Sequence, residues 1–104
     1  MSHCLRAGLI PDYVISLDPH ADRIIRWFGD PDLEKRPDDD YFRRQDLDPH
    51  FAENEKKRNQ ELIELVNRHA KSMKLIIATC ADPGLVKRAV QAGFDLYWWN
   101  PLYD

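Results

Sequence analysis

Residues 75–99, LIIATCADPGLVKRAVQAGFDLYWW, hold two short apolar runs separated by a stretch with helical spacing. The runs at 75–79 and 96–99 are uninterrupted, which is typical of strands buried on both faces of a parallel sheet. The stretch between them places apolar side chains on one helix face, at Leu85, Val86, Ala89 and Val90. The order strand, helix, strand predicts a right-handed parallel crossover.

The boundaries of this helix are marked by Asp82-Pro83 and Gly93. An aspartate before a helix accepts hydrogen bonds from the first turn, and proline at the first helical position loses no needed donor. Glycine supplies the left-handed residue that ends many helices. The same Asp-Pro signal predicts helix starts at Asp18-Pro19 and Asp48-Pro49.

Outward from this core, residues 13–17 form a third apolar run and predict a first strand. Two more helical stripes are visible, one at Ala21, Ile24, Ile25 and Phe28 before Gly29, the other at Leu62, Leu65, Val66, Ala70 and Met73. The second helix starts with the polar residues 53–61, so its first turns are expected to project. We therefore expect an α/β fold, a three-layer unit with a small, mostly parallel sheet.

The 104 residues suffice for a single domain, 1–104, of a size with a modest core. Residues 30–61 hold more than half of the charged side chains and are expected to form a charged, solvent-exposed insert. The net charge of −3 argues against nucleic acid as a partner, and no apolar run is long enough for a membrane. Two cysteines without a disulfide framework favour a cytoplasmic protein.

Three strands are few for a sheet covered on both faces. An uncovered outer strand invites pairing with another chain, so we expect a homo-oligomer.

Ligands of open parallel sheets bind beyond the carboxyl ends of the strands. Here that edge carries Asp18, residues 79–82 and Asn100. A carboxylate at Asp18 can hold Mg²⁺ on a nucleotide phosphate, His20 can accept a proton from an attacking hydroxyl, and Asn100 can contact a base or sugar. The alternative is that Asp18 only caps a helix and His20 is a surface residue.

Three further signals are weaker. Residues 38–40, Asp-Asp-Asp, resemble a metal-holding Asp-x-Asp pattern but are better explained as a solvated acidic loop. Trp98 and Trp99 can stack on a ligand or fill the core on the two faces of the sheet. Cys80 is expected to be a buried structural thiol. No phosphate-binding loop, Gly-x-Gly-x-x-Gly or zinc spacing occurs.

The stretch from Gly8 to Pro19, GLIPDYVISLDP, resembles a motif of one Rossmann-like family. That family joins the motility-associated-factor glycosyltransferases to the 6-hydroxymethylpterin pyrophosphokinase-like proteins. Residues 75–104, ending in the aromatic strand and Asn100-Pro101, are similar to a later part of the same domain. The family carries a strand and a Gly-Pro-Ser-type loop upstream of the motif, whereas this chain begins after them. The resemblance therefore implies a partial, N-terminally truncated domain.

Two functions follow from this resemblance. The first is a nucleotide-dependent transferase, acting on a nucleotide sugar or transferring pyrophosphate, with Asp18, His20 and Asn100 at its site and Mg²⁺ as cofactor. The second is a non-catalytic module that binds a nucleotide weakly or only assembles with a partner. Residues 82–96 also suit a βα unit of a barrel or receiver-like domain, although 104 residues cannot close a barrel.

Overall fold

The computed structural model describes residues 1–17, 25–33 and 49–100, and its strands form a three-stranded parallel sheet in the order β1-β2-β3. The strands are β1 (Tyr13–Ser16), β2 (Lys74–Ala78) and β3 (Asp95–Trp99). All three predicted strands are confirmed to within one residue at each end. The fold is mixed α/β and compatible with a Rossmann-like unit.

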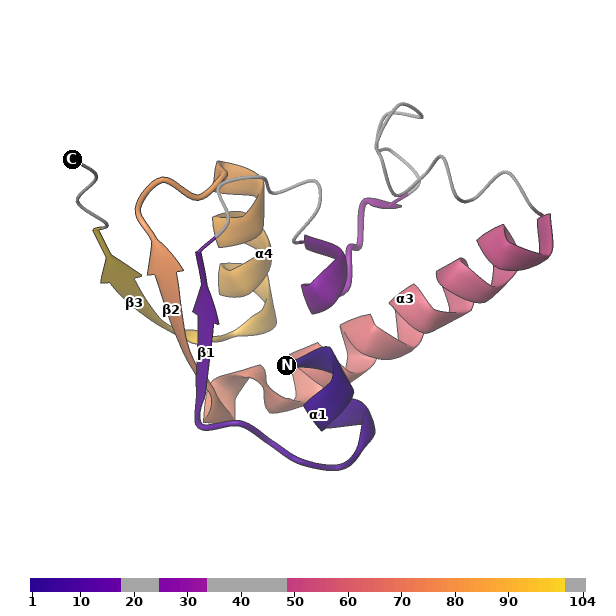
Figure 1. The fold of residues 1–104 in the computed structure, drawn as a ribbon, viewed down its shortest axis with the longest axis horizontal. Coiled ribbons are helices and arrows are strands. Elements are labelled where there is room, and N and C mark those ends of the chain that lie inside the picture. Colours follow the sequence, from indigo (N-terminus) through magenta and orange to yellow (C-terminus); the bar gives the residue numbers. More distant parts are fainter. Residues whose placement is uncertain (18–24, 34–48, 101–104) are drawn as a thin grey trace.

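A short helix precedes β1, and the other described helices lie between the strands (Figure 1). They are α1 (Ser2–Arg6), the 3₁₀ helix η1 (Ile25–Phe28), α3 (Pro49–His69), the 3₁₀ helix η4 (Ala70–Ser72) and α4 (Pro83–Ala92). The chain reaches β2 through α3 and η4, and α4 joins β2 to β3. Because each connection carries a helix, successive strands run in the same direction.

The ends of α4 follow the local sequence signals. The Asp82 carboxylate accepts a hydrogen bond of 2.7 Å from the Gly84 N–H, and Pro83 is the first helical residue. At the other end Gly93 is left-handed, with φ of 97° and ψ of 21°. The predicted cap and stop of this helix are confirmed.

The hydrophobic core lies between the sheet and the helices. β2 contributes Leu75 and Ile77, which are fully buried. The other core side chains come from the described helices and from the loops before β2 and β3, namely Leu5, Phe28, Leu62, Val66, Ala70, Met73, Leu85, Ala89, Ala92 and Phe94. Phe28 and Phe94 meet edge to face, with ring centroids 5.7 Å apart. Residues from both ends of the chain thus share one core.

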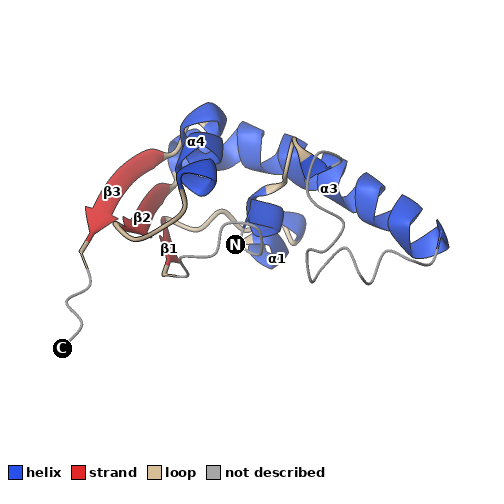
Figure 2. Cartoon of the chain, turned by 90° about the horizontal axis from the view of Figure 1, so that it is seen from above, coloured by secondary structure: helices blue, strands red, loops and turns tan. Residues whose placement is uncertain are grey.

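Only one face of the sheet is covered by the described helices (Figure 2). On the other face the side chains alternate outward, and five of them are between 43 and 61% exposed: Tyr13, Ile15, Leu17, Tyr97 and Trp99. We call these five residues the open face. The second helical layer of the expected three-layer unit is not formed by the residues that the structure describes.

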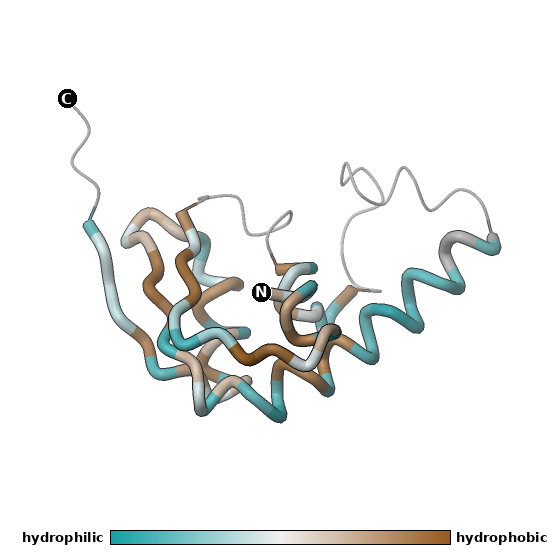
Figure 3. The backbone as a smooth tube through the Cα atoms, turned by 60° about the horizontal axis from the view of Figure 1, so that its bottom comes forward, coloured by the Kyte–Doolittle hydropathy of each residue, from teal (hydrophilic) through white to brown (hydrophobic). Residues whose placement is uncertain are grey.

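The charged middle of the sequence divides into three parts. Residues 49–61 form the first half of α3, which is hydrophilic and extends away from the sheet (Figure 3). Residues 34–48 lie outside the described ranges. Asp30, at the start of the expected exposed insert, is instead only 1% exposed. It is buried because its segment packs between α3 and α4, as described below.

Candidate functional site

The carboxyl ends of β2 and β3 bring two polar side chains together. The Thr79 hydroxyl donates a hydrogen bond of 3.0 Å to Oδ1 of Asn100, and the Thr79 N–H donates one of 2.8 Å to the Trp99 carbonyl. Both polar residues are exposed. The structure therefore places Asn100 at the predicted edge, next to a hydroxyl group, with its Nδ2 donors left for another acceptor.

Asp82 lies three residues after Thr79, at the start of α4, and is also exposed. One of its carboxylate oxygens is engaged by the Gly84 N–H. A negative charge at this helix start disfavours a phosphate there, so the hydroxyls of a sugar or the N–H groups of a base are the donors that suit this end of α4.

Two of the three predicted site residues, Asp18 and His20, lie outside the described residues. So does the acidic run at 38–40. β1 ends at Ser16, and Leu17 is the last described residue before Asp18. In the described part of the chain, no three His, Cys, Asp or Glu side chains gather as metal ligands.

Trp98 and Trp99 lie on opposite faces of β3, as the strand alternation predicts. Trp98 is beside Ile77 on the covered face, and Trp99 is beside Ala78 on the open face. Neither is a core residue: Trp98 is 56% exposed and Trp99 43%. The expectation of core packing on both faces is wrong because β3 is an edge strand and the open face has no described cover. Cys80 is exposed rather than buried, since it lies in the turn after β2.

A second polar cluster, missed from sequence, surrounds Arg88 of α4. Its guanidinium donates three hydrogen bonds: 2.7 Å to the Gly29 carbonyl, 2.9 Å to the Phe28 carbonyl and 2.8 Å to Oδ1 of Asn67. Arg88 is only 4% exposed. Burial lowers the pKa of the guanidinium, and the charge of Asp30 acts in the opposite direction.

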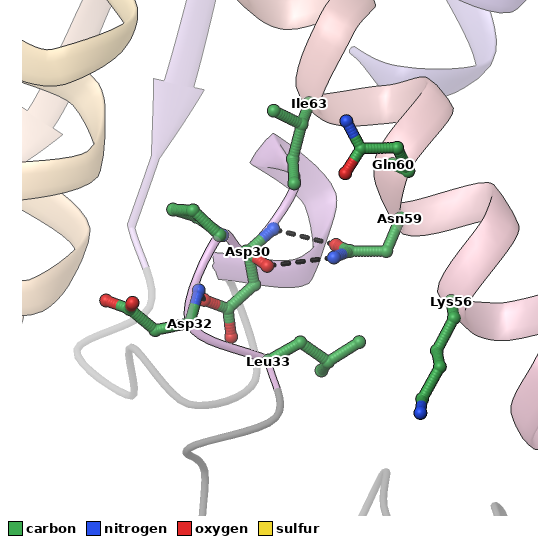
Figure 4. A pocket seen from close by; sticks show the side chains of 8 residues that line it. Asp30, Asp32, Leu33, Lys56, Asn59, Gln60 and Ile63 are labelled. Atoms are coloured by element: carbon green, nitrogen blue, oxygen red, sulfur yellow. Dashed lines mark hydrogen bonds between the residues drawn. The ribbon is translucent and has the colours of Figure 1, made fainter.

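The backbone of Asp30 is hydrogen-bonded to a side chain of α3. The Asp30 N–H donates 2.8 Å to Oδ1 of Asn59, and Nδ2 of Asn59 donates 2.8 Å to the Asp30 carbonyl (Figure 4). The Asp30 carboxylate accepts from the Asp32 N–H at 3.0 Å. These bonds hold the segment 28–32 between α3 and α4.

A pocket of about 290 Å³ opens beside this joint, lined by residues 30–33 and by Lys56, Asn59, Gln60 and Ile63. Its Asn59 amide already bonds the backbone of Asp30, so this amide serves the packing of the chain. The sequence signal for this segment was Gly29, which was expected to end a helix and has the left-handed φ of 75°. Nothing in the local pattern indicated which distant side chains would meet it.

In comparisons with known proteins, no family model, curated protein or solved structure matches the chain. No helix in the described ranges has the length and apolar character needed to cross a membrane.

Proposed function

We propose that this chain is a nucleotide-dependent, transferase-like domain whose ligand lies across the carboxyl edge of the sheet. The observation that carries the proposal is the exposed Thr79–Asn100 pair at the ends of two parallel strands, where ligands of open α/β sheets bind. The resemblance of residues 8–19 to the glycosyltransferase and pyrophosphokinase-like family points to the same ligand class. A cytoplasmic location suits its two free cysteines.

Each site residue has a role in this proposal. Asn100 and Thr79 hydrogen-bond the base or sugar, through groups that both donate and accept. Asp18, directly after Leu17, is the carboxylate for Mg²⁺, and His20 is the base. The Asp18 carboxylate suffices for Mg²⁺, because the ion needs only one or two carboxylates when phosphates complete its coordination. When bound, the cation would neutralise phosphate charge.

A thermal-shift panel of nucleotides and nucleotide sugars, with and without Mg²⁺, tests the proposal. Ligand at one hundred times its Kd stabilises a domain by about 2.7 kcal/mol, which raises the Tm of a domain of this size by roughly 10–20 °C. Asp18→Asn should abolish the Mg²⁺-dependent rise while leaving the Tm of the free protein almost unchanged, because asparagine caps a helix about as well as aspartate.

Two controls make this result specific. Thr79→Val keeps the side-chain shape and removes the hydroxyl, so it should reduce the rise. Asp95→Asn, at the amino end of β3, should not. A panel in which no nucleotide raises Tm contradicts the proposal, and an Asp18→Asn variant that responds as the parent does assigns Asp18 to capping alone.

The second candidate function is a non-catalytic assembly module, favoured by the open face. Tyr13, Ile15 and Leu17 on β1 and its extension, with Tyr97 and Trp99 on β3, leave apolar surface uncovered. Contiguous apolar surface of this kind marks interaction sites on soluble proteins. If no nucleotide binds and the chain forms a defined oligomer in sedimentation, this second function is favoured.

A further inference from the structure

β3 is an edge strand, and its backbone leaves one row of hydrogen-bonding groups unused. The Asp95 N–H donates to the Met73 carbonyl at 3.3 Å, and the Trp99 carbonyl accepts from the Thr79 N–H at 2.8 Å. In a strand, alternate residues direct both backbone groups to the same side. Residues 95, 97 and 99 therefore face β2, and the N–H and C=O groups of Leu96 and Trp98 face away from the sheet.

The side chains of β3 are also those of an interior strand. Tyr97 and Trp99 are exposed on the open face, and Trp98 is 56% exposed on the covered face. Uninterrupted apolar strands belong inside parallel sheets, and edge strands are normally protected by charge, proline or a bulge. Within Asp95–Trp99 only Asp95 is charged, and no described element lies beyond the strand (Figures 1 and 2).

We propose that β3 of one chain pairs antiparallel with β3 of a second copy, about a two-fold axis at Tyr97. This register matches the strand to itself over its full length. Leu96 and the partner's Trp98 exchange two hydrogen bonds, and the symmetry repeats the exchange, so all four outward groups of each strand are used. The two three-stranded sheets become one continuous sheet.

The charges and side chains support a second copy as the occupant. In this register Asp95 lies opposite the partner's Trp99, so the two Asp95 carboxylates are kept at opposite ends of the pair. Tyr97 meets the partner's Tyr97 on the open face. Trp98 lies beside the partner's Leu96 on the covered face, which covers the exposed indole.

The other edge of the sheet suits such pairing less well. On β1 the covered face is already closed, with Val14 packed against the core and Ser16 only 6% exposed. Its exposed apolar side chains, Tyr13 and Ile15, lie on the open face alone. β3 is thus the edge that gains cover on both faces by pairing. This inference does not depend on the nucleotide proposal. If the chain is an assembly module, the β3 pair is the contact through which two copies associate.

Hydrogen exchange on the unmodified chain tests the pairing directly. The Leu96 and Trp98 amides should be protected at high concentration and lose that protection on dilution, in step with the change from dimer to monomer in sedimentation. The Tyr97 amide, which faces β2, serves as the internal control and should not follow the dilution. A chain that stays monomeric, or a dimer in which Leu96 and Trp98 exchange freely, overturns the proposal.

Cross-linking gives a second readout on chains in which Cys4 and Cys80 are replaced by serine. Tyr97→Cys should form an intermolecular disulfide readily, because directly opposed residues of antiparallel strands bring Cβ atoms to about 4.5–5.5 Å. Ile15→Cys should not, although Ile15 on β1 is more exposed than Tyr97, at 61% against 46%. Preferential cross-linking at Ile15 would place the partner on the open face instead. Nucleotide binding is scored separately, so either proposal can fail alone.

Discussion

Of the four glycines, Gly29 has the least room for a side chain. Its φ is 75°, and a Cβ built there would lie 2.6 Å from the Ile63 backbone nitrogen. An alanine must therefore adopt a strained conformation and also push α3 away from the segment 28–32. Gly8 has a similar φ of 79°, but a Cβ there would meet nothing within 4 Å.

These two glycines form a matched pair for a stability experiment. Gly8→Ala should lower the free energy of unfolding by about 1 kcal/mol, the cost of the left-handed conformation alone. Gly29→Ala should cost clearly more, on the order of 3 kcal/mol, because overpacking adds to the strain. Urea unfolding followed by circular dichroism measures both. Equal losses in the two variants would show that the contact with Ile63 is not tight.

Single residues were predictable from sequence where the cause is local. The Asp82 cap and the left-handed Gly93 depend only on neighbours along the chain, and both were found as expected. The left-handed Gly29 belongs to the same class. The burial of Asp30 was not predictable, because its partner Asn59 lies 29 residues away and neither residue type favours the interior.

At the scale of elements, Arg88 joins three segments. It links α4 to α3 through Asn67 and to the C-terminal end of η1 through the carbonyls of Phe28 and Gly29. The apolar pattern of α4 predicted the helix and its buried side. It did not predict a buried arginine, whose acceptors come from 21 to 60 residues earlier in the chain.

Replacing Arg88 tests whether this joint holds the helices together. Arg88→Met keeps the apolar stem but leaves two buried carbonyls without their donor, so the free energy of unfolding should fall by about 3–5 kcal/mol. Arg88→Lys keeps the charge, but the single nitrogen of an ammonium cannot reach the three acceptors that Nε, Nη1 and Nη2 of the guanidinium contact. This variant should therefore also lower the free energy of unfolding. Guanidinium unfolding measures both variants. A lysine variant as stable as the parent would mean that charge, not the hydrogen-bond geometry, matters here.

At the scale of the whole molecule, the parallel α/β order was predictable because hydrophobic periodicity and Asp-Pro and Gly signals agree along residues 75–99. The number of layers was not. A continuous apolar strand predicts cover on both faces, whereas the described helices cover only one. The proposed pairing of two copies through β3 would account for the exposed apolar side chains of that strand.

The proposed ligand site is likewise a property of the whole fold, since Thr79 and Asn100 meet only when β2 and β3 pair. The sequence predicted the position of Asn100 at this edge from its place after a strand, and the strand pairing brings Thr79 beside it. The most direct measurement is a nuclear magnetic resonance titration of the labelled chain with Mg²⁺ and a nucleotide or nucleotide sugar. We predict saturable shifts of the Thr79 amide and the Asn100 side-chain amide, with Lys74 and Asp95 at the amino ends of the strands unchanged. Shifts confined to the pocket beside Asp30, or none at either carboxyl end, would contradict the proposed site.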